Sequence, residues 1–406
     1  RKEGFLAPSL RLRFSVMMFL EYFVPGAIVP ILSLYLKNYL GFSSSRVGLV
    51  LAMPALAAVL APFVTVHIAD RFIRAERLLA LCHFLGAGLM VALSFQTRFQ
   101  AFLGLYFVYG LVFAPTYGLT NTVVLHHVAN ARRDFGGVRM WGTAGWAAVA
   151  WTFGFFWLQG DDGSRLPDAL MVSALASAVL ALYSLTLPRS PAHHGKPSTL
   201  AYWESLKLFA RPSLLLLCLL TLLNSMVHQF YYFGMSPFLS QVGFANNHIM
   251  PIMSIGQVSE IVVLAVLGAC LARLGMKWIM IIGALFQALR YAVFAFRPET
   301  AWIVPIIGTH GFCYAFFFTT AYLYIEQHST LKTRAGAQQI FTIIITGLGA
   351  FAGFQASGLV GQWCQSERGV IDFGRFWLVP MAIGLAVAVV MALFFREEER
   401  SPDAGV

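Results

Sequence analysis

Repeated apolar runs, each about twenty residues long, constrain the fold of this sequence more than any other feature. An α-helix rises about 1.5 Å per residue, so each run is long enough to cross the roughly 30 Å hydrocarbon core of a bilayer. The runs are continuous, whereas strands of membrane barrels alternate between apolar and polar residues. With 58% hydrophobic and 11% charged residues, the sequence predicts an all-α protein that crosses a membrane many times.

Twelve predicted spans divide the chain into two halves of six. They run approximately over Phe14–Leu36, Val47–Ile68, Leu78–Phe95, Phe102–Val128, Val138–Leu158, Ala169–Leu187, Ser213–Leu239, Ile249–Leu274, Trp278–Phe296, Ala301–Ile325, Ala337–Val360 and Phe376–Phe395. We expect two pseudo-symmetric six-helix bundles, residues 1–188 and 213–396, separated by a linker at 189–212 and followed by a tail at 397–406.

Basic residues are distributed unequally between the two sides of the predicted membrane. If the N-terminus is cytoplasmic, the inner segments carry nineteen Lys and Arg residues and the outer segments carry seven. Because cytoplasmic loops are enriched in these residues, we expect both termini in the cytoplasm and the spans in the cell inner membrane. The linker then lies on the inner surface. Its residues 200–210 have the spacing of an amphipathic helix, and residues 189–199 fit an unstructured linker equally well.

Composition also limits the partners and the chemistry. The net charge of +10 comes from basic residues between the spans, so no nucleic-acid partner is predicted. The five cysteines lack the CxxC spacing of a metal site, and no cofactor is expected. An enzyme is the least favoured class, because the spans contain no nucleophile with a matching base. We expect a monomer in a lipid bilayer that binds a small molecule.

The eighth span carries two polar residues near its centre, Gln257 and Glu260. Glu260 lies about eleven residues into the span, or roughly 17 Å, which places it near the bilayer midplane. A carboxylate at that depth costs on the order of 3 kcal/mol unless it is protonated, paired or facing water. Gln257 lies one turn earlier on the same face. Both are predicted to bind substrate, with Glu260 also exchanging protons. A hydrogen-bonded pair between helices is the alternative.

The fifth span places a cation, a hydroxyl and an indole on one face. Arg139, Thr143 and Trp146 are spaced i, i+4 and i+7. An arginine can hold two ligand oxygens, and an indole can stack on a planar ring. These residues therefore predict a substrate-binding face. If the helix begins only after Gly136 and Gly137, Arg139 extends instead to the lipid headgroups.

The seventh and tenth spans supply four further candidates for substrate binding. Gln229 and Tyr232 match the donor and acceptor edges of a polar solute, although hydrogen bonding between helices accounts for them too. His310 and Tyr314 lie one turn apart among phenylalanines. A packing role and a ligand contact account equally well for Tyr314. A metal site is not predicted at His310, because a lone histidine lacks the further ligands that a metal needs.

The first span carries a second carboxylate, Glu21. Burial and nearby charges tune an intramembrane carboxyl group, so it can exchange protons in the range of a cellular gradient. We predict Glu21, together with Glu260, as a proton-coupling residue. The alternative is a structural pair between Glu21 and an arginine such as Arg139. For Arg290, in the ninth span, we expect a structural pair or an extension to the headgroups rather than a substrate contact.

The connection after the second span is rich in charge. Asp70, Arg71 and Arg74 can join neighbouring helix ends by ion pairs, and we predict a gating or structural role for this loop. The corresponding turn after the eighth span covers residues 272–277, about 200 positions later. Internal repeats of this kind are the architecture of secondary transporters. The loop resembles the signature loop of the major facilitator superfamily, with Val66 where that signature has glycine.

Three motifs together resemble one family within that superfamily. They are Pro115-Thr-Tyr-Gly-Leu-Thr-Asn121-Thr122, Val138-Arg-Met-Trp-Gly-Thr143 and Met253-Ser-Ile-Gly-Gln257-Val-Ser-Glu260, in the fourth, fifth and eighth spans. With Arg290-Tyr-Ala-Val-Phe-Ala-Phe in the ninth, they are similar to the nucleoside:proton symporter family from about Phe14 to Phe395. The resemblance implies the superfamily fold and nucleoside uptake driven by a proton gradient, with the ligand between the two halves.

The resemblance also implies roles for individual residues. It implies contacts to ribose and base for Arg139, Thr143, Gln229, Gln257 and Glu260. Trp146 and Tyr314 lie at positions where the family has aromatic rings. Four positions depart from the pattern: Ala315 replaces a carboxylate, His310 a tyrosine, Tyr232 an amide and Glu21 a glutamine. Proton coupling has then either moved to Glu21 or been lost, and the substrate can differ.

The leading hypothesis is a proton-coupled transporter of nucleosides that works by alternating access. A second hypothesis keeps the fold and assigns another polar solute, such as a sugar, a glycoconjugate or a drug, with or without coupling to protons. A third is a membrane receptor that binds its ligand without transport. Competition by adenosine and uridine separates the first hypothesis from the second, and flux into liposomes separates both from the third.

Overall fold

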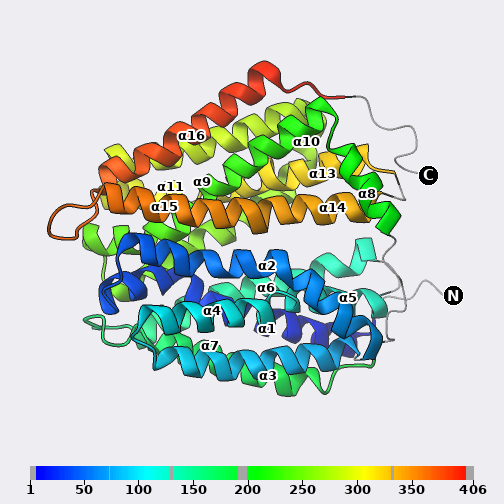
Figure 1. Cartoon of the computed structure of the whole chain (residues 1–406), viewed down its shortest axis with the longest axis horizontal. Coiled ribbons are helices and arrows are strands. Elements are labelled where there is room, and N and C mark those ends of the chain that lie inside the picture. The colour runs from blue at the N-terminus through cyan, green and yellow to red at the C-terminus, as the bar shows by residue number, and fades with distance from the viewer. Residues whose placement is uncertain (1–5, 73, 129–130, 191–198, 331–332, 399–406) are drawn as a thin grey trace. The chain divides into compact units, whose positions relative to one another are not determined.

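The computed structural model describes the backbone of residues 6–72, 74–128, 131–190, 199–330 and 333–398, and their side chains except at 62–72, 131–133 and 199–203. This part of the chain is helical and contains no strand, apart from one isolated bridge between Gln365 and Ile371 (Figure 1). A helix satisfies its own backbone N–H and C=O groups, which hydrocarbon cannot do. The predicted all-α class is confirmed.

The described residues form two compact units. The first lies within Arg1–Phe42, Met53–Gly195 and Leu239–Ser254, and the second within Ser43–Ala52, Lys196–Phe238 and Ile255–Val406. The first half of the chain contains α1 (Pro8–Leu34), η1 (Tyr35–Tyr39), α2 (Ser44–Phe72), α3 (Ala75–Ser94), α4 (Phe99–Phe113), α5 (Thr116–His127), α6 (Ala131–Trp151), η2 (Thr152–Trp157) and α7 (Asp168–Ser184). The second half contains α8 (Thr199–Leu208), α9 (Pro212–Val242), α10 (Asn246–Phe296), α11 (Thr300–Ile307), α12 (His310–Phe312), η3 (Cys313–Thr319), α13 (Thr320–His328), α14 (Arg334–Thr342), η4 (Ile343–Gly349), α15 (Ala350–Trp363) and α16 (Phe373–Phe394).

The helices overlap every predicted span, and the largest difference is at the fifth span, whose helix α6 begins at Ala131 instead of Val138. Among the described residues, nine segments are long and apolar enough to cross a membrane, and α7 is a shorter apolar helix. The eighth and ninth predicted spans are both part of α10, which is broken at Gly275, where φ is 76°. Glycine adopts this left-handed conformation without steric cost, so Gly275 makes the turn between the two spans.

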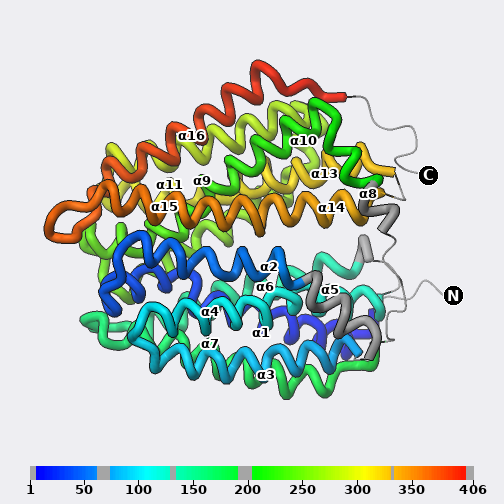
Figure 2. Tube along the Cα trace, in the orientation of Figure 1, coloured from blue at the N-terminus to red at the C-terminus, as the bar shows by residue number. Residues whose placement is uncertain are grey.

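Several spans contain a wide π-helical turn that the sequence pattern did not predict. The segments η1 and η2 end the helices α1 and α6, whereas η3 and η4 lie between α-helices, so that α14, η4 and α15 form one continuous rod from Arg334 to Trp363 (Figure 2). A π-helical turn shifts the face on which later side chains lie, and such turns are frequent at functional sites. Tyr314 lies in the π-helical segment η3.

In the first unit, small residues bring α1 and α6 together. Gly142 lies against the ring of Tyr22, and Gly145 lies against the backbone of Phe19. Without a side chain at these positions the two helices approach closely, as is common in membrane helix pairs. The α6 face that carries the predicted binding residues is thereby held beside α1.

In the second unit, α10 packs closely against the segment that begins with α12. A side chain at Gly311 would overlap the backbone of Ser259 and Glu260, so only glycine fits without a shift. The Gly311 N–H also donates a hydrogen bond to Ser259 Oγ over 3.0 Å. These contacts hold the middle of α10 at a defined distance from α12.

The linker helix α8 packs against α14 within the second unit. The hydroxyl of Ser205 on α8 donates a hydrogen bond to the carbonyl oxygen of Thr333 over 3.1 Å. The part of the linker at 191–198 lies outside the described residues.

Candidate functional site

Arg139 lies well inside its helix and stacks on an aromatic ring of the first unit. Because α6 begins at Ala131, it includes Gly136 and Gly137, and the alternative in which the helix starts after these glycines is wrong. The guanidinium of Arg139 lies over the ring of Tyr22, with Cζ 4.0 Å from the ring centroid. A cation in this position gains about 0.5–2 kcal/mol, depending on its exposure to water.

The other two α6 candidates share the face of Arg139. Thr143 and Trp146 are half-buried, as Arg139 is, and the indole of Trp146 packs against Gly26 of α1. Tyr22 also contacts the ring of Tyr117 on α5, at 5.2 Å between centroids. The three predicted residues therefore lie on one partly accessible face that continues into an aromatic contact between α1 and α5.

Glu21 is buried in the same unit and is hydrogen-bonded to a histidine instead of an arginine. Its exposed fraction is 0%, and its Oε2 lies 2.9 Å from His83 Nε2. The hydroxyl of Thr116 lies 2.6 Å from Glu21 Oε1, and His83 Nδ1 lies 2.9 Å from Ser177 Oγ. The expected alternative pairing with Arg139 is wrong.

His83 is a residue that the sequence analysis did not select. The only sign of it in the sequence is a histidine within an otherwise apolar span. Its partner is 62 positions earlier in the chain, and helical periodicity relates only residues within one helix. The pairing therefore became visible only when α1 and α3 were placed in space.

In the second unit, three predicted residues from two helices lie together. The side-chain amide of Gln257 on α10 and the carboxyl group of Glu260 both lie within interaction range of the phenol of Tyr232 on α9. Gln257 Oε1 is buried and has no hydrogen-bond partner in the described part of the chain. At the predicted centre of a span, this acceptor therefore lies one helical turn from a carboxyl group.

A second polar cluster in this unit surrounds Arg290. Its side chain is 0% exposed, so the expected extension to the headgroups is wrong. Nη1 of Arg290 lies 2.8 Å from His310 Nδ1, and the guanidinium lies over the rings of Tyr231 and Tyr291, with Cζ 4.9 and 5.2 Å from their centroids. The imidazole of His228 lies 5.1 Å from that of His310, centroid to centroid.

The remaining candidates of the second unit differ in accessibility. Gln229 on α9 is half-buried, and Tyr314 is 39% exposed, whereas His310 is only 2% exposed. Tyr314 lies 6.3 Å from the ring of His228, centroid to centroid. The aromatic group that contacts the predicted residues therefore includes His228, which is not among the predicted site residues.

The charged loop after α2 is described only in part. The side chains of Asp70 and Arg71 lie outside the described residues, and Arg74 is the N-cap residue of α3. The predicted ion pairing in this loop stays a prediction.

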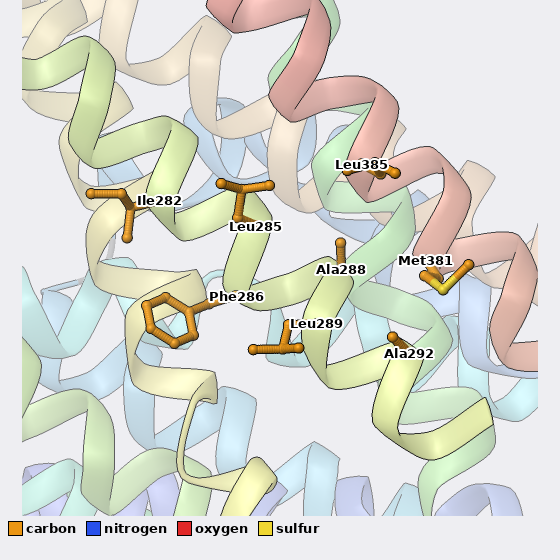
Figure 3. A pocket seen from close by; sticks show the side chains of 8 residues that line it. All are labelled: Ile282, Leu285, Phe286, Ala288, Leu289, Ala292, Met381 and Leu385. Atoms are coloured by element: carbon orange, nitrogen blue, oxygen red, sulfur yellow. The ribbon is translucent and has the colours of Figure 1, made fainter. Parts of the chain in front are cut away.

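One groove described in the second unit is apolar and does not include these polar residues. It has a volume of about 450 Å³ and lies between the second part of α10 and α16. Figure 3 shows its lining side chains, which carry only carbon and sulfur: Ile282, Leu285, Phe286, Ala288, Leu289, Ala292, Met381 and Leu385. Such a surface offers no hydrogen-bond partner to a polar solute. Among the described residues, no group of three or more His, Cys, Asp or Glu could hold a metal ion.

Comparisons with known proteins agree with the helical architecture. The family model described as nucleoside H+ symporter matches residues 9–400. The putative nucleoside transporter YegT of Escherichia coli K12 is 30% identical over 402 residues, covering 95% of this chain and 94% of that protein. Xanthosine permease of the same organism is 28% identical over 408 residues, covering 96% of each chain. The crystal structure of the nucleoside transporter NupG has a TM-score of 0.86 at 25% identity and covers 96% of this chain and 100% of that chain.

These relatives are transporters and not enzymes, and their similarity extends over nearly the whole length of both chains. The all-helical fold with long apolar spans confirms the predicted major facilitator architecture. The chain therefore belongs to the nucleoside H+ symporter family and is an integral membrane transporter.

Proposed function

We propose that this transporter carries nucleosides together with protons by alternating access, in the cell inner membrane with both termini in the cytoplasm. Its family membership and the nucleoside-transporting relatives support nucleosides as the solute class. The unequal distribution of basic residues along the sequence supports the orientation.

The arrangement of Tyr232, Gln257 and Glu260 is the observation that carries this proposal. The amide of Gln257 lies close to the phenol of Tyr232, and its buried Oε1 has no hydrogen-bond partner in the described part of the chain. A buried acceptor and a carboxyl group suit a ligand with both donors and acceptors, such as a nucleoside. Glu260 can accept a ligand hydrogen bond when ionised and donate one when protonated. Solute binding and proton binding are thereby linked at one residue.

The other predicted residues complete the proposed binding set. In the first unit, Arg139 and Thr143 supply donors for ribose hydroxyls or base carbonyls, and Trp146 supplies a flat apolar surface. In the second unit, Gln229, His310 and Tyr314 are proposed as further contacts, with His310 limited to Nε2 because Nδ1 already contacts Arg290. Asp70, Arg71 and Arg74 are proposed to stabilise one state of the cycle by ion pairing.

Transport by purified protein in liposomes tests the proposal. We expect labelled uridine, adenosine or xanthosine to accumulate when the outside is more acidic than the lumen, and a protonophore to abolish the accumulation. Unlabelled nucleosides should compete and maltose should not. Competition by maltose but not by nucleosides would assign another solute class, and accumulation that survives the protonophore would refute proton coupling. Binding without flux would identify a receptor.

A further inference from the structure

Four polar side chains from four helices form a hydrogen-bonded network in the apolar interior of the first unit. They are Glu21 of α1, His83 of α3, Thr116 of α5 and Ser177 of α7, all at most 1% exposed. Polar groups at such depth are costly unless each hydrogen bond is made. Here each side chain has at least two partners, so the network is complete without water.

The two hydroxyl groups of the network each have a choice of acceptor. The oxygen of Thr116 lies 2.6 Å from Glu21 Oε1 and 2.7 Å from the carbonyl oxygen of Phe113. The oxygen of Ser177 lies 2.9 Å from His83 Nδ1 and 3.0 Å from the carbonyl oxygen of His83. A hydroxyl has one proton to donate and can also accept. Rotation of either hydroxyl therefore changes the atom to which it donates its hydrogen bond.

These two rotations let the network hold different numbers of protons with its hydrogen bonds intact. When His83 is neutral, its Nε2–H donates to Glu21 and its Nδ1 accepts from Ser177. When His83 takes up a proton, Nδ1–H donates to Ser177, whose hydroxyl turns to the carbonyl of His83. A further proton on Glu21 Oε1 donates to Thr116, whose hydroxyl turns to the carbonyl of Phe113. Proton uptake thus requires only small hydroxyl rotations and no new partner.

Several titratable groups surround the pair of Glu21 and His83. Among the described side chains, those that face Glu21 are Cys82 of α3, Tyr109 of α4 and Tyr117 of α5, and α7 contributes hydroxyls near it. The cation of Arg139 on α6 lies over Tyr22 and interacts electrostatically with Tyr117.

The network is connected to the proposed solute-binding face through adjacent residues. Tyr22 follows Glu21 on α1, and Tyr117 follows Thr116 on α5. The rings of the two tyrosines lie 5.2 Å apart, centroid to centroid, and the guanidinium of Arg139 stacks on the ring of Tyr22. A shift of α1 relative to α5 that alters the Glu21–Thr116 hydrogen bond therefore also moves the ring on which Arg139 stacks.

We propose that Glu21 and His83 form a proton-binding pair that takes up and releases one proton in each transport cycle, in addition to the proton exchanged by Glu260. This inference rests on the proposed function, because it concerns the same proton-coupled transport. It predicts two coupled protons per solute, where Glu260 alone would give one.

The coupling ratio can be measured from the balance of two gradients in liposomes. The membrane potential is held at zero and the liposomes carry a tenfold uridine gradient. One pH unit is a tenfold proton ratio, so a transporter that couples n protons to each solute stops net flux at a pH difference of about 1/n, which we call the balance point. For the natural protein we expect net uridine flux to stop at a pH difference of about 0.5. For Glu21→Gln and for His83→Gln we expect it to stop at a pH difference of about 1. The balance is an equilibrium property, so a variant that is merely slower leaves it unchanged.

Glu76→Gln is the matched control. Glu76 is another buried carboxyl group of the first unit, at 3% exposure, but its Oε2 accepts from the backbone N–H of Ser190 over 3.1 Å and contacts no histidine in the described part of the chain. The balance for this variant should equal that of the natural protein. Thr116→Ser retains the rotating hydroxyl and should also leave the balance unchanged.

Two results would overturn the inference while leaving the proposed function intact. One is a balance at about 1 in the natural protein, and the other is a balance that is unchanged in both Glu21→Gln and His83→Gln. If neither variant folds, the protons bound with uridine by the natural protein are counted in weakly buffered detergent solution with a pH indicator. An uptake of about one proton per uridine, against the expected value of about two, would equally refute it. Absence of any proton-driven uridine transport in the natural protein would refute the proposed function instead.

Discussion

The guanidinium of Arg290 and the imidazole of His310 are bound to each other inside the second unit, Nη1 to Nδ1 over 2.8 Å. A guanidinium can only donate hydrogen bonds, so His310 Nδ1 must be the acceptor and the imidazole proton lies on Nε2. Nε and Nη2 of Arg290 have no hydrogen-bond partner among the described residues. His310 thus supplies the main polar contact of a fully buried cation.

Replacing His310 with Phe should destabilise the protein more than replacing both members of the pair. The single change removes an acceptor from a buried charge and is expected to cost about 2–3 kcal/mol. The double variant Arg290→Met with His310→Phe removes the charge as well, and apolar replacement of a buried polar pair is often nearly neutral. Thermal unfolding of the purified variants measures the difference. A double variant less stable than His310→Phe would contradict this account of the pair.

Replacing Tyr232 with Phe should weaken solute binding. We propose that the phenol supports the nearby amide of Gln257, so losing one net hydrogen bond of about 0.5–1.5 kcal/mol lowers affinity by about two- to tenfold. Tyr291→Phe is the control, because the Tyr291 hydroxyl donates to the carbonyl oxygen of Val227 over 2.7 Å inside the unit. That variant should lose stability and keep its affinity. Equal affinities of the two variants in uridine binding would show that Gln257 needs no support from Tyr232.

Replacing Gly311 with Ala should damage the middle of α10. The added Cβ would lie 2.6 Å from the backbone nitrogen of Glu260, so one of the two helices must move. Overpacking of this kind costs about 1–3 kcal/mol, which exceeds the gain in helix propensity of about 1 kcal/mol. Gly88→Ala is the control, since a Cβ there meets no atom within 4 Å. We expect a lower unfolding temperature and slower uptake only for Gly311→Ala.

Replacing Tyr22 with Leu should weaken solute binding through Arg139. The ring of Tyr22 lies under the guanidinium, and losing a cation–π contact of about 0.5–2 kcal/mol corresponds to about a two- to thirtyfold loss of affinity if Arg139 binds solute. Tyr35→Leu removes another buried ring, one that stacks on Tyr39 and lies away from any guanidinium in the described structure. Its affinity should match that of the natural protein. Unchanged uridine binding in Tyr22→Leu would remove Arg139 from the proposed binding set.

The sequence by itself determined the helical class and the approximate positions of the apolar helices. Run length sets where a span begins and ends, so the central position of Glu260 could be predicted before its neighbours were known. Helical periodicity also placed Arg139, Thr143 and Trp146 on one face, because all three belong to one helix.

Only the tertiary structure decided which side chains meet between helices. Glu21 contacts His83 across α1 and α3, and Arg290 contacts His310 across α10 and α12. Such partners depend on which helices are neighbours and on their relative rotation, and small residues such as Gly311 set how close they come. Local periodicity contains none of this information, because in a membrane most helix surfaces are equally apolar and pack by shape rather than by pattern.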